Sequence, residues 1–248
     1  MDECMLPINT DEPQPVIFEA LDAEAVQMAA KRTHGSGGPT LLDADIWKYI
    51  LCSKAYGKDS DNLCATIAEF SKILATKELE PEMLTEYVAC RLIPLDKGAD
   101  KNGKIGVRPI GIGEVLRRIV GRVIMEVVRP DIRTTVGPIQ TCAGARAGIE
   151  ASIHAAREMM EGPDAEAVLL VDADNAFNRL NRKLAIHNTR EVCPSFHRFI
   201  HNTYRKAANL YVNDGSKSES LLSDKGCTQG DRRHGLLCCM NCTSDLTA

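Results

Sequence analysis

Residues 88–113 read VACRLIPLDKGADKNGKIGVRPIGIG. Two β-leaning runs, Val88–Leu95 and Ile105–Ile112, flank a connection at residues 96–104 that is rich in lysine and glycine. Short apolar runs on either side of a turn-forming stretch are typical of a β-hairpin. We therefore predict a hairpin with a basic, glycine-rich tip.

Helical patterns surround this hairpin on both sides. Before it, helical patterns cover three stretches: Phe18–Arg32, Asp43–Tyr56 and Ser60–Thr76. After it, they cover four more: residues 114–128, 149–160, 182–191 and 195–206. Apolar positions three and four residues apart fall on one side of a helix, so these stretches predict amphipathic helices.

Two further segments predict strands. Residues 167–171 are a continuous apolar run, which is consistent with a buried central strand. A second hairpin is expected from Asn209–Val212, through a turn at residues 213–215, back toward Ser223. The fold class we predict is α+β. We divide the chain into a loose acidic tail (1–15), a helical region (16–87), a mixed region (88–231) and a polar tail (232–248).

The composition is that of a globular protein. The chain has 248 residues, of which 44% are hydrophobic and 26% are charged, and this excludes collagen, coiled coils and low-complexity chains. No run of about eighteen apolar residues occurs, so we expect no membrane partner. Residues 1–14 contain acidic but no basic residues, which is unlike a signal peptide. We therefore expect a reducing, intracellular environment.

The ten cysteines do not predict disulfides or a metal site. Seven are scattered singly through the chain, without the spacing of a disulfide framework. His234, Cys238, Cys239 and Cys242 could in principle hold zinc, but a structural zinc site needs a second pair of ligands elsewhere, which the sequence lacks. We interpret the cysteines as reduced thiols.

Charge is distributed unevenly. Residues 97–133 contain 9 Lys and Arg against 4 Asp and Glu, a net charge of +5, whereas residues 1–96 have a net charge of −9. A compact basic stretch indicates either a face that meets phosphate or a set of solvated side chains, and charge alone does not separate the two.

Three segments could carry chemistry. Asp172 ends the apolar run and Asp174 follows it, and such carboxylates suit either a Mg²⁺ ion or a helix N-cap. Lysines in the first hairpin and Arg108 could bind a triphosphate, or could be a solvated turn. The small residues of Gly226–Asp231 permit close approach of a ligand to the backbone.

Taken in order, four motifs resemble those of a retroelement reverse transcriptase of the retrotransposon and group II intron type. They are RLIPLDK at Arg91–Lys97, GVRPIGIGE at Gly106–Glu114, VDADNAF at Val171–Phe177 and TQGD at Thr228–Asp231. The resemblance implies a right-hand fold with helical fingers, part of a palm sheet and no thumb. It also implies RNA-directed DNA polymerisation, with a template-primer and a deoxynucleoside triphosphate as partners.

The resemblance also implies roles for single residues. Asp172 resembles the first catalytic aspartate, which with the carbonyl of Ala173 binds the two Mg²⁺ ions of the polymerase reaction. Arg108, together with Lys97 or with one of Lys101 and Lys104, resembles the pair that neutralises the incoming triphosphate. The resemblance further assigns the nucleotide pocket to Ala176, Phe177, Gln229 and Gly230, where Phe177 is the steric gate that selects deoxynucleotides. Template backbone contacts are expected from Arg117, Arg118 and Arg122.

The chain departs from the family pattern after Asp231. The family continues with Pro-Leu and later a pair of aspartates, whereas this chain has Arg232-Arg233-His234 and no paired aspartates downstream. Two-metal catalysis needs a second carboxylate from a neighbouring strand. We therefore expect a truncated and inactive polymerase, or alternatively a nucleic-acid-binding remnant or a decayed reading frame without a role.

Residues 232–248 also suggest a genetic explanation. One coding string for Arg232 to Cys239, read one base later, gives Ala-Asp-Met-Ala-Phe-Tyr-Ala, which is similar to the palm helix that the family places here. We hypothesise that this tail is frameshifted sequence, which the genomic locus would reveal.

Overall fold

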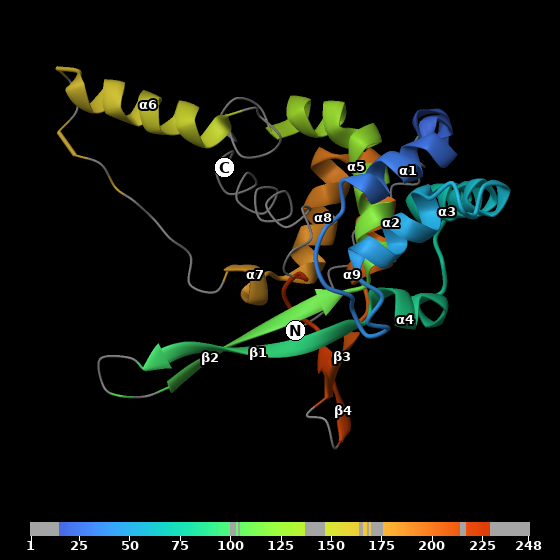
Figure 1. The fold of residues 1–248 in the computed structure, drawn as a ribbon. Helices are drawn as coiled ribbons and strands as arrows, with labels where there is room; N and C mark the ends of the chain where they lie inside the picture. Colours follow the sequence, from blue (N-terminus) through green and yellow to red (C-terminus); the bar gives the residue numbers. More distant parts are fainter. Residues whose placement is uncertain are drawn as a thin grey trace, which may run out of the picture.

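The computed structural model describes residues 15–99, 103, 105–136, 147–163, 166, 167, 169, 176–213 and 217–228. These residues form an α+β fold in which a body of packed helices adjoins a mixed β-sheet (Figure 1). The helices are η1 (Pro15–Ala20), α1 (Ala23–Lys31), α2 (Ala44–Cys52), α3 (Lys58–Thr76), η2 (Pro81–Leu84), α4 (Thr85–Val88), α5 (Val115–Val136), α6 (Gly148–Glu161), α7 (Ala176–Arg179), α8 (Arg182–Val192) and α9 (Pro194–Tyr204). The strands are β1 (Cys90–Ala99), β2 (Ile105–Gly113), β3 (Ala208–Asn213) and β4 (Ser218–Ser223).

Polar caps set the beginnings of several helices. The carboxylates of Asp22 and Asp43 accept hydrogen bonds from backbone N–H groups in the first turns of α1 and α2, and Asn181 does the same for α8. These side chains satisfy donors that have no partner within the helix. The expected helical stretches are confirmed with ends that differ by a few residues, except that Phe18–Arg32 is divided between η1 and α1 and that α5 is longer than expected.

Helix α5 runs past its expected end at residue 128 and continues to Val136. Pro130 lies inside it, although proline removes one backbone hydrogen bond. Ile132, two residues further on, is only 2% exposed and packs in the core. Burial of this side chain favours continuation of the helix beyond the proline.

One hydrophobic core joins the helices on either side of residue 87. Phe18, Leu21, Leu74, Ile124 and Phe199 are almost completely buried and belong to a single cluster. Helices α1, α3, α5 and α9 supply most of this core, and α3 contacts both α1 and α9. No disulfide joins the cysteines that the structure describes, and burial raises the pKa of the Cys64 thiol to about 11.

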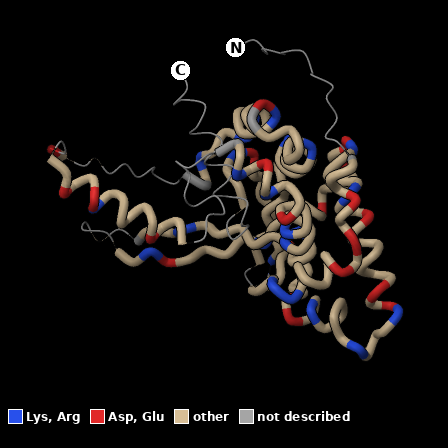
Figure 2. The backbone as a smooth tube through the Cα atoms, turned by 90° about the horizontal axis from the view of Figure 1, so that it is seen from above, with Lys and Arg blue, Asp and Glu red and all other residues tan. Residues whose placement is uncertain are grey.

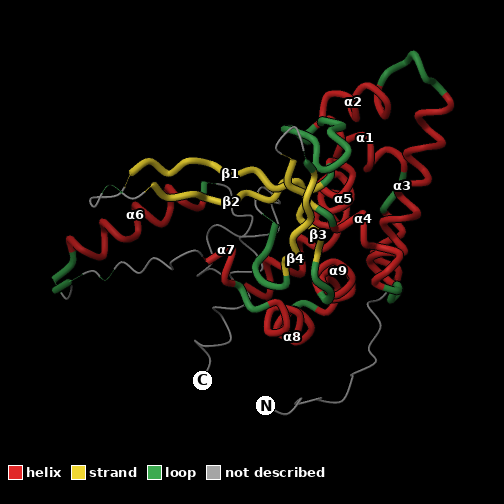
Figure 3. Tube along the Cα trace, turned by 90° about the horizontal axis from the view of Figure 1, so that it is seen from below, coloured by secondary structure: helices red, strands yellow, loops and turns green. Residues whose placement is uncertain are grey.

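The sheet has the order β2-β1-β3-β4. β1 pairs with β2 in antiparallel fashion from Cys90↔Gly113 to Ala99↔Ile105, and β3 pairs with β4 in the same way. Both hairpins are thus confirmed, although Val88 belongs to α4 and not to the first strand. β1 and β3 are parallel and pair only at Cys90↔Leu210 and Arg91↔Tyr211. Because this pairing is confined to the base, the outer part of the first hairpin projects away from the helical body (Figures 1 and 3).

Helix α6 extends on the same side as the first hairpin (Figure 3). Its apolar residues are exposed, including Ile149 at 62% and Ile153 at 55%. The expected buried strand at residues 167–171 is wrong at Ala167 and Leu169, since neither lies in a strand and Leu169 is 87% exposed. The other residues of that run lie outside the described part. None of the helices described combines the length and apolar character needed to cross a membrane.

The packing of α8 against α9 predicts a pH dependence of stability. Nδ1–H of the half-buried His197 donates to the carbonyl of Ile186 at 3.2 Å. Burial, together with the neighbouring His201, lowers the pKa of His197 from 6.5 to about 4. Between pH 6.5 and pH 4 this histidine is therefore protonated more readily in the unfolded chain than in the folded chain. The free energy of unfolding consequently falls as the pH drops from 6.5 toward 4. Allowing for partial exposure of the ring, we expect a loss of about 1 kcal/mol between neutral pH and about pH 5.

Urea unfolding at several pH values measures this loss. His197→Gln should make the unfolding free energy less dependent on pH in this range. His154→Gln, on the exposed surface of α6, provides the matched control and should leave the dependence unchanged. Equal pH dependence in wild type and His197→Gln would contradict the assignment.

Candidate functional site

The first hairpin presents two cations on one face. Arg108 pairs with Leu95, and a Cβ atom at Gly106 would lie 3.4 Å from Cβ of Lys97. Side chains two residues apart on a strand share a face, so Lys97 and Arg108 project from the same side. Both are exposed, and neither makes a hydrogen bond or ion pair with the residues the structure describes. Val107 and Asp96 occupy the opposite face.

The base of this hairpin is fixed to a loop between α1 and α2. Arg91 donates to the carbonyl of Gly37 at 3.0 Å. The carboxylate of Glu114 accepts from both the backbone N–H and the hydroxyl of Thr40, at 2.7 and 2.8 Å. Gly38 lies so close that a Cβ there would be 2.7 Å from the backbone nitrogen of Glu114, which only glycine permits. The loop therefore positions the hairpin relative to α5.

Arg117 does not fulfil its predicted role. Arg117 is only 2% exposed. Its guanidinium donates to the carbonyl of Val88 at 3.0 Å and lies 5.5 Å from the ring centre of Tyr204. A template phosphate cannot reach a side chain buried in this way. The assignment of Arg117 to the template backbone is therefore wrong, and the residue instead supports the start of β1 from within the core.

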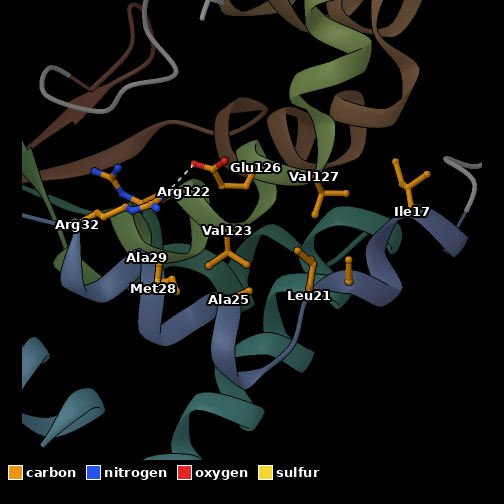
Figure 4. A pocket seen from close by; sticks show the side chains of 11 residues that line it. Ile17, Leu21, Ala25, Met28, Ala29, Arg32, Arg122, Val123, Glu126 and Val127 are labelled. Atoms are coloured by element: carbon orange, nitrogen blue, oxygen red, sulfur yellow. Dashed lines mark ion pairs between the residues drawn. The ribbon is translucent and has the colours of Figure 1, made fainter.

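Arg118 and Arg122 are also engaged within the fold. Arg118 donates to the carbonyls of His34 (2.8 Å) and Ser36, and so holds the loop described above. Arg122 is half-buried and lines an apolar pocket between α1 and α5, beside Arg32 and Glu126 (Figure 4). Template contact by these two residues stays a prediction.

A single basic face, which is one of the two interpretations of residues 97–133, does not form among the residues that the structure describes. Lys97 and Arg108 lie on the hairpin, Arg117 is buried, and Arg129 pairs with Glu126 at 2.9 Å. Basic and acidic positions are interspersed over the helical body (Figure 2). The excess of positive charge in the sequence is thus divided among different sides of α5 and the hairpin.

The segment that precedes Gln229 packs at the base of the hairpin. The Thr228 hydroxyl lies 3.7 Å from Sγ of Cys90, and its methyl group would be 3.5 Å from a Cβ placed at Gly113. The N–H of Gly226 donates to the carbonyl of Leu180, at 2.9 Å. Leu180 directly follows α7, which begins at Ala176. Described residues within or close to all four sequence motifs therefore meet at this place.

Arg182 connects the start of α8 to the segment that follows β4. Its Nε donates to the carbonyl of Gly226 at 2.7 Å, while its terminal nitrogens donate to the carbonyls of Ser223 and Lys225 at 2.7 and 3.1 Å. Its guanidinium also lies 5.5 Å from the ring centre of Tyr204, as that of Arg117 does. Burial lowers the pKa of Arg182, but the surrounding carbonyls stabilise its charge.

Sequence reasoning missed both Arg182 and Glu114. An arginine in the first turn of a helix and a glutamate before another helix carry no distinctive spacing. The Gly-rich loop at residues 34–39 was recognisable in the sequence, but its partner Glu114 lies 74 residues from Thr40. Such long-range contacts leave no periodic signal in a single sequence.

The remaining predicted site residues lie outside what the structure describes. Asp172, Ala173, Gln229 and Gly230 fall in this category, as do the side chains of Ala176 and Phe177, whose backbone forms the start of α7. Within the described residues, no group of three or more His, Cys, Asp and Glu side chains is placed to hold a metal ion. Magnesium binding therefore stays a prediction from the sequence.

A scan against protein-family models finds no match for this chain. A search of curated proteins likewise returns no match.

Proposed function

We propose that the chain is the fingers and part of the palm of a retroelement reverse transcriptase, and that its first hairpin binds the triphosphate of a nucleotide. The observation that supports this most is the exposed pair of Lys97 and Arg108 on one hairpin face, without partners among the described residues. The contacts of Thr228 and Gly226 support it further, because they place residues close to the other motifs at the base of the same hairpin.

The two cations suit a triphosphate for different reasons. The planar guanidinium of Arg108 can donate two parallel hydrogen bonds to phosphate oxygens, whereas the ammonium group of Lys97 acts as a mobile point charge. The β1–β2 ladder is regular from the base to Asp96↔Val107 and resumes at Ala99↔Ile105 after a register shift, so Arg108 lies in the regular part and Lys97 directly beyond it, with both side chains on one face. The hairpin can therefore bring both charges to one polyanion.

Replacement of Arg108 tests the proposal directly. Loss of a charge-assisted, two-pronged contact removes about 1.5–3 kcal/mol. We therefore expect Arg108→Ala to weaken binding of a fluorescent deoxynucleoside triphosphate, in the presence of Mg²⁺, by about tenfold to a hundredfold. Fluorescence anisotropy at fixed salt concentration measures this change. Lys54→Ala, which removes an exposed charge from the helical body, should have little effect.

A second variant separates position from net charge. Arg108→Ala combined with Val107→Arg keeps the charge of the hairpin but moves it to the opposite face. We expect this double variant to bind as weakly as Arg108→Ala. Wild-type affinity in the double variant would mean that the hairpin attracts anions without a defined face, and would overturn the proposal.

A nucleic-acid-binding remnant is the second candidate, because the 248 residues contain no two adjacent aspartates. Template-primed incorporation distinguishes it from a polymerase. Incorporation that Asp172→Asn abolishes would support the polymerase. RNA binding that weakens steeply with salt, without incorporation, would support the remnant. Folded protein that binds neither nucleotide nor RNA would contradict both.

A further inference from the structure

A second basic site lies away from the first hairpin, in a cavity of about 490 Å³ between α8, the end of α9 and the end of β4. Eleven residues line this cavity, and six of them are cationic: Arg179, Arg182, Lys183, Arg205, Lys206 and Lys225. Asp224 is the one acidic residue among the eleven. We call this the basic cavity. Neither Lys97 nor Arg108 belongs to it.

Part of this positive charge is already balanced by neighbouring residues. Arg205 pairs with Glu78, and Lys206 pairs with Glu82. By contrast, the ammonium groups of Lys183 and Lys225 make no hydrogen bond or ion pair with the described residues, and both side chains are exposed. The buried charge of Arg182 faces backbone carbonyls and no paired carboxylate among the described residues. The cavity therefore retains an excess of positive charge.

The start of α8 adds to this excess. The helix begins at Arg182, and its first turn contains Lys183 and no acidic residue. The N-terminus of a helix carries a partial positive charge, so basic residues there are unfavourable unless an anion is close. Burial lowers the pKa of Arg182, and the nearby Arg117 contributes in the same direction, whereas Tyr204 and Asp224 act in the opposite direction. An anion in the basic cavity would add a favourable interaction with Lys183 and with the start of α8.

We infer that the basic cavity binds phosphate groups, with Lys183 and Lys225 as the side chains that contact them. Two mobile ammonium groups and a helix N-terminus are the donors that phosphate sites use. A cavity of about 490 Å³ has room for more than one phosphate group. The inference is independent of the proposed polymerase function, because it uses none of the same side chains.

Removal of both lysines tests the inference. We expect Lys183→Ala with Lys225→Ala to weaken binding of pyrophosphate, and of a single-stranded ten-nucleotide RNA, by at least about tenfold. For the RNA, the slope of log affinity against log salt should fall by about 0.7 for each phosphate group that the variant no longer neutralises. Titration calorimetry suits pyrophosphate and fluorescence anisotropy suits the RNA. Lys54→Ala with Lys58→Ala removes the same charge from exposed positions near the start of α3 and is the matched control.

Asp224→Asn provides a test in the opposite direction, since it removes the carboxylate of the lining. We expect it to tighten binding severalfold without loss of folding. RNA that pyrophosphate displaces would identify backbone phosphate as the ligand, and binding of pyrophosphate alone would identify a small phosphate compound. Equal weakening in the lysine variant and its control, or no binding of either ligand, would overturn the inference.

Discussion

Arg182→Ala is expected to lower the free energy of unfolding by about 3–5 kcal/mol, because it removes a buried charge-assisted network whose single bonds each contribute about 1.5–3 kcal/mol. Arg182 is 8% exposed and donates to backbone carbonyls of Ser223, Lys225 and Gly226. Alanine removes these donors, although the Ser223 hydroxyl still donates to the carbonyl of Lys225, and it also removes the contact with the Tyr204 ring. Urea unfolding followed by circular dichroism measures the loss.

Two companion variants sharpen this measurement. Arg182→Lys keeps the charge but cannot serve several carbonyls in different directions, so it should recover only a small part of the stability. Lys183→Ala, at the exposed neighbouring position, should change the free energy of unfolding by less than about 0.5 kcal/mol. If Arg182→Ala unfolds at the same urea concentration as the wild type, Arg182 does not hold the junction together.

The second large effect is expected at Asn202, which joins α9 to the end of α3. Its Nδ2 donates to the carbonyls of Leu74 and Lys77 at 3.0 and 2.8 Å, and its Oδ1 accepts from the N–H of Leu79 at 3.2 Å. The residue is 4% exposed. Asn202→Ala leaves three backbone groups without these partners, so we expect a loss of about 2–4 kcal/mol.

Asn202→Asp and Asn62→Ala are the controls for this prediction. The aspartate keeps an acceptor for Leu79 but brings oxygen against the two carbonyls, and should therefore be at least as destabilising as alanine. Asn62 is exposed on α3, and its replacement should change the free energy of unfolding by less than about 0.5 kcal/mol. Similar stability of Asn202→Ala and Asn62→Ala would show that the contact with α3 is not needed.

The replacement of Arg182 also bears on the functional proposals. Arg182 fixes the segment before Gln229, and it lines the basic cavity. A change there alters both regions together, which is why Arg108, Lys183 and Lys225 are the residues chosen to test function. All three are exposed, so their replacement changes charge at the surface without disturbing the core.

The amino-acid sequence by itself predicted the secondary structure well. Apolar spacing located α3, α8 and α9, and the turn-forming stretches located both hairpins. These signals are local, because the periodicity of a helix or strand depends on residues that are close together in the sequence. The same reasoning failed at residues 167 and 169, where an apolar run is described outside any strand. A run of apolar residues favours burial, but it does not determine which part of the fold will cover it.

Only the tertiary structure decided which charges are available to a ligand. The sequence placed Arg108 and Arg117 in the same basic stretch, yet one is exposed on the hairpin and the other is 2% exposed in the core. Arg117 is buried against Val88 and Tyr204, which both lie far from it along the chain. The basic cavity likewise combines residues from three stretches of the chain, 179–186, 204–207 and 224–225. Solvation and pairing of a charge are properties of the folded surface, and neighbouring residues in the chain do not determine them.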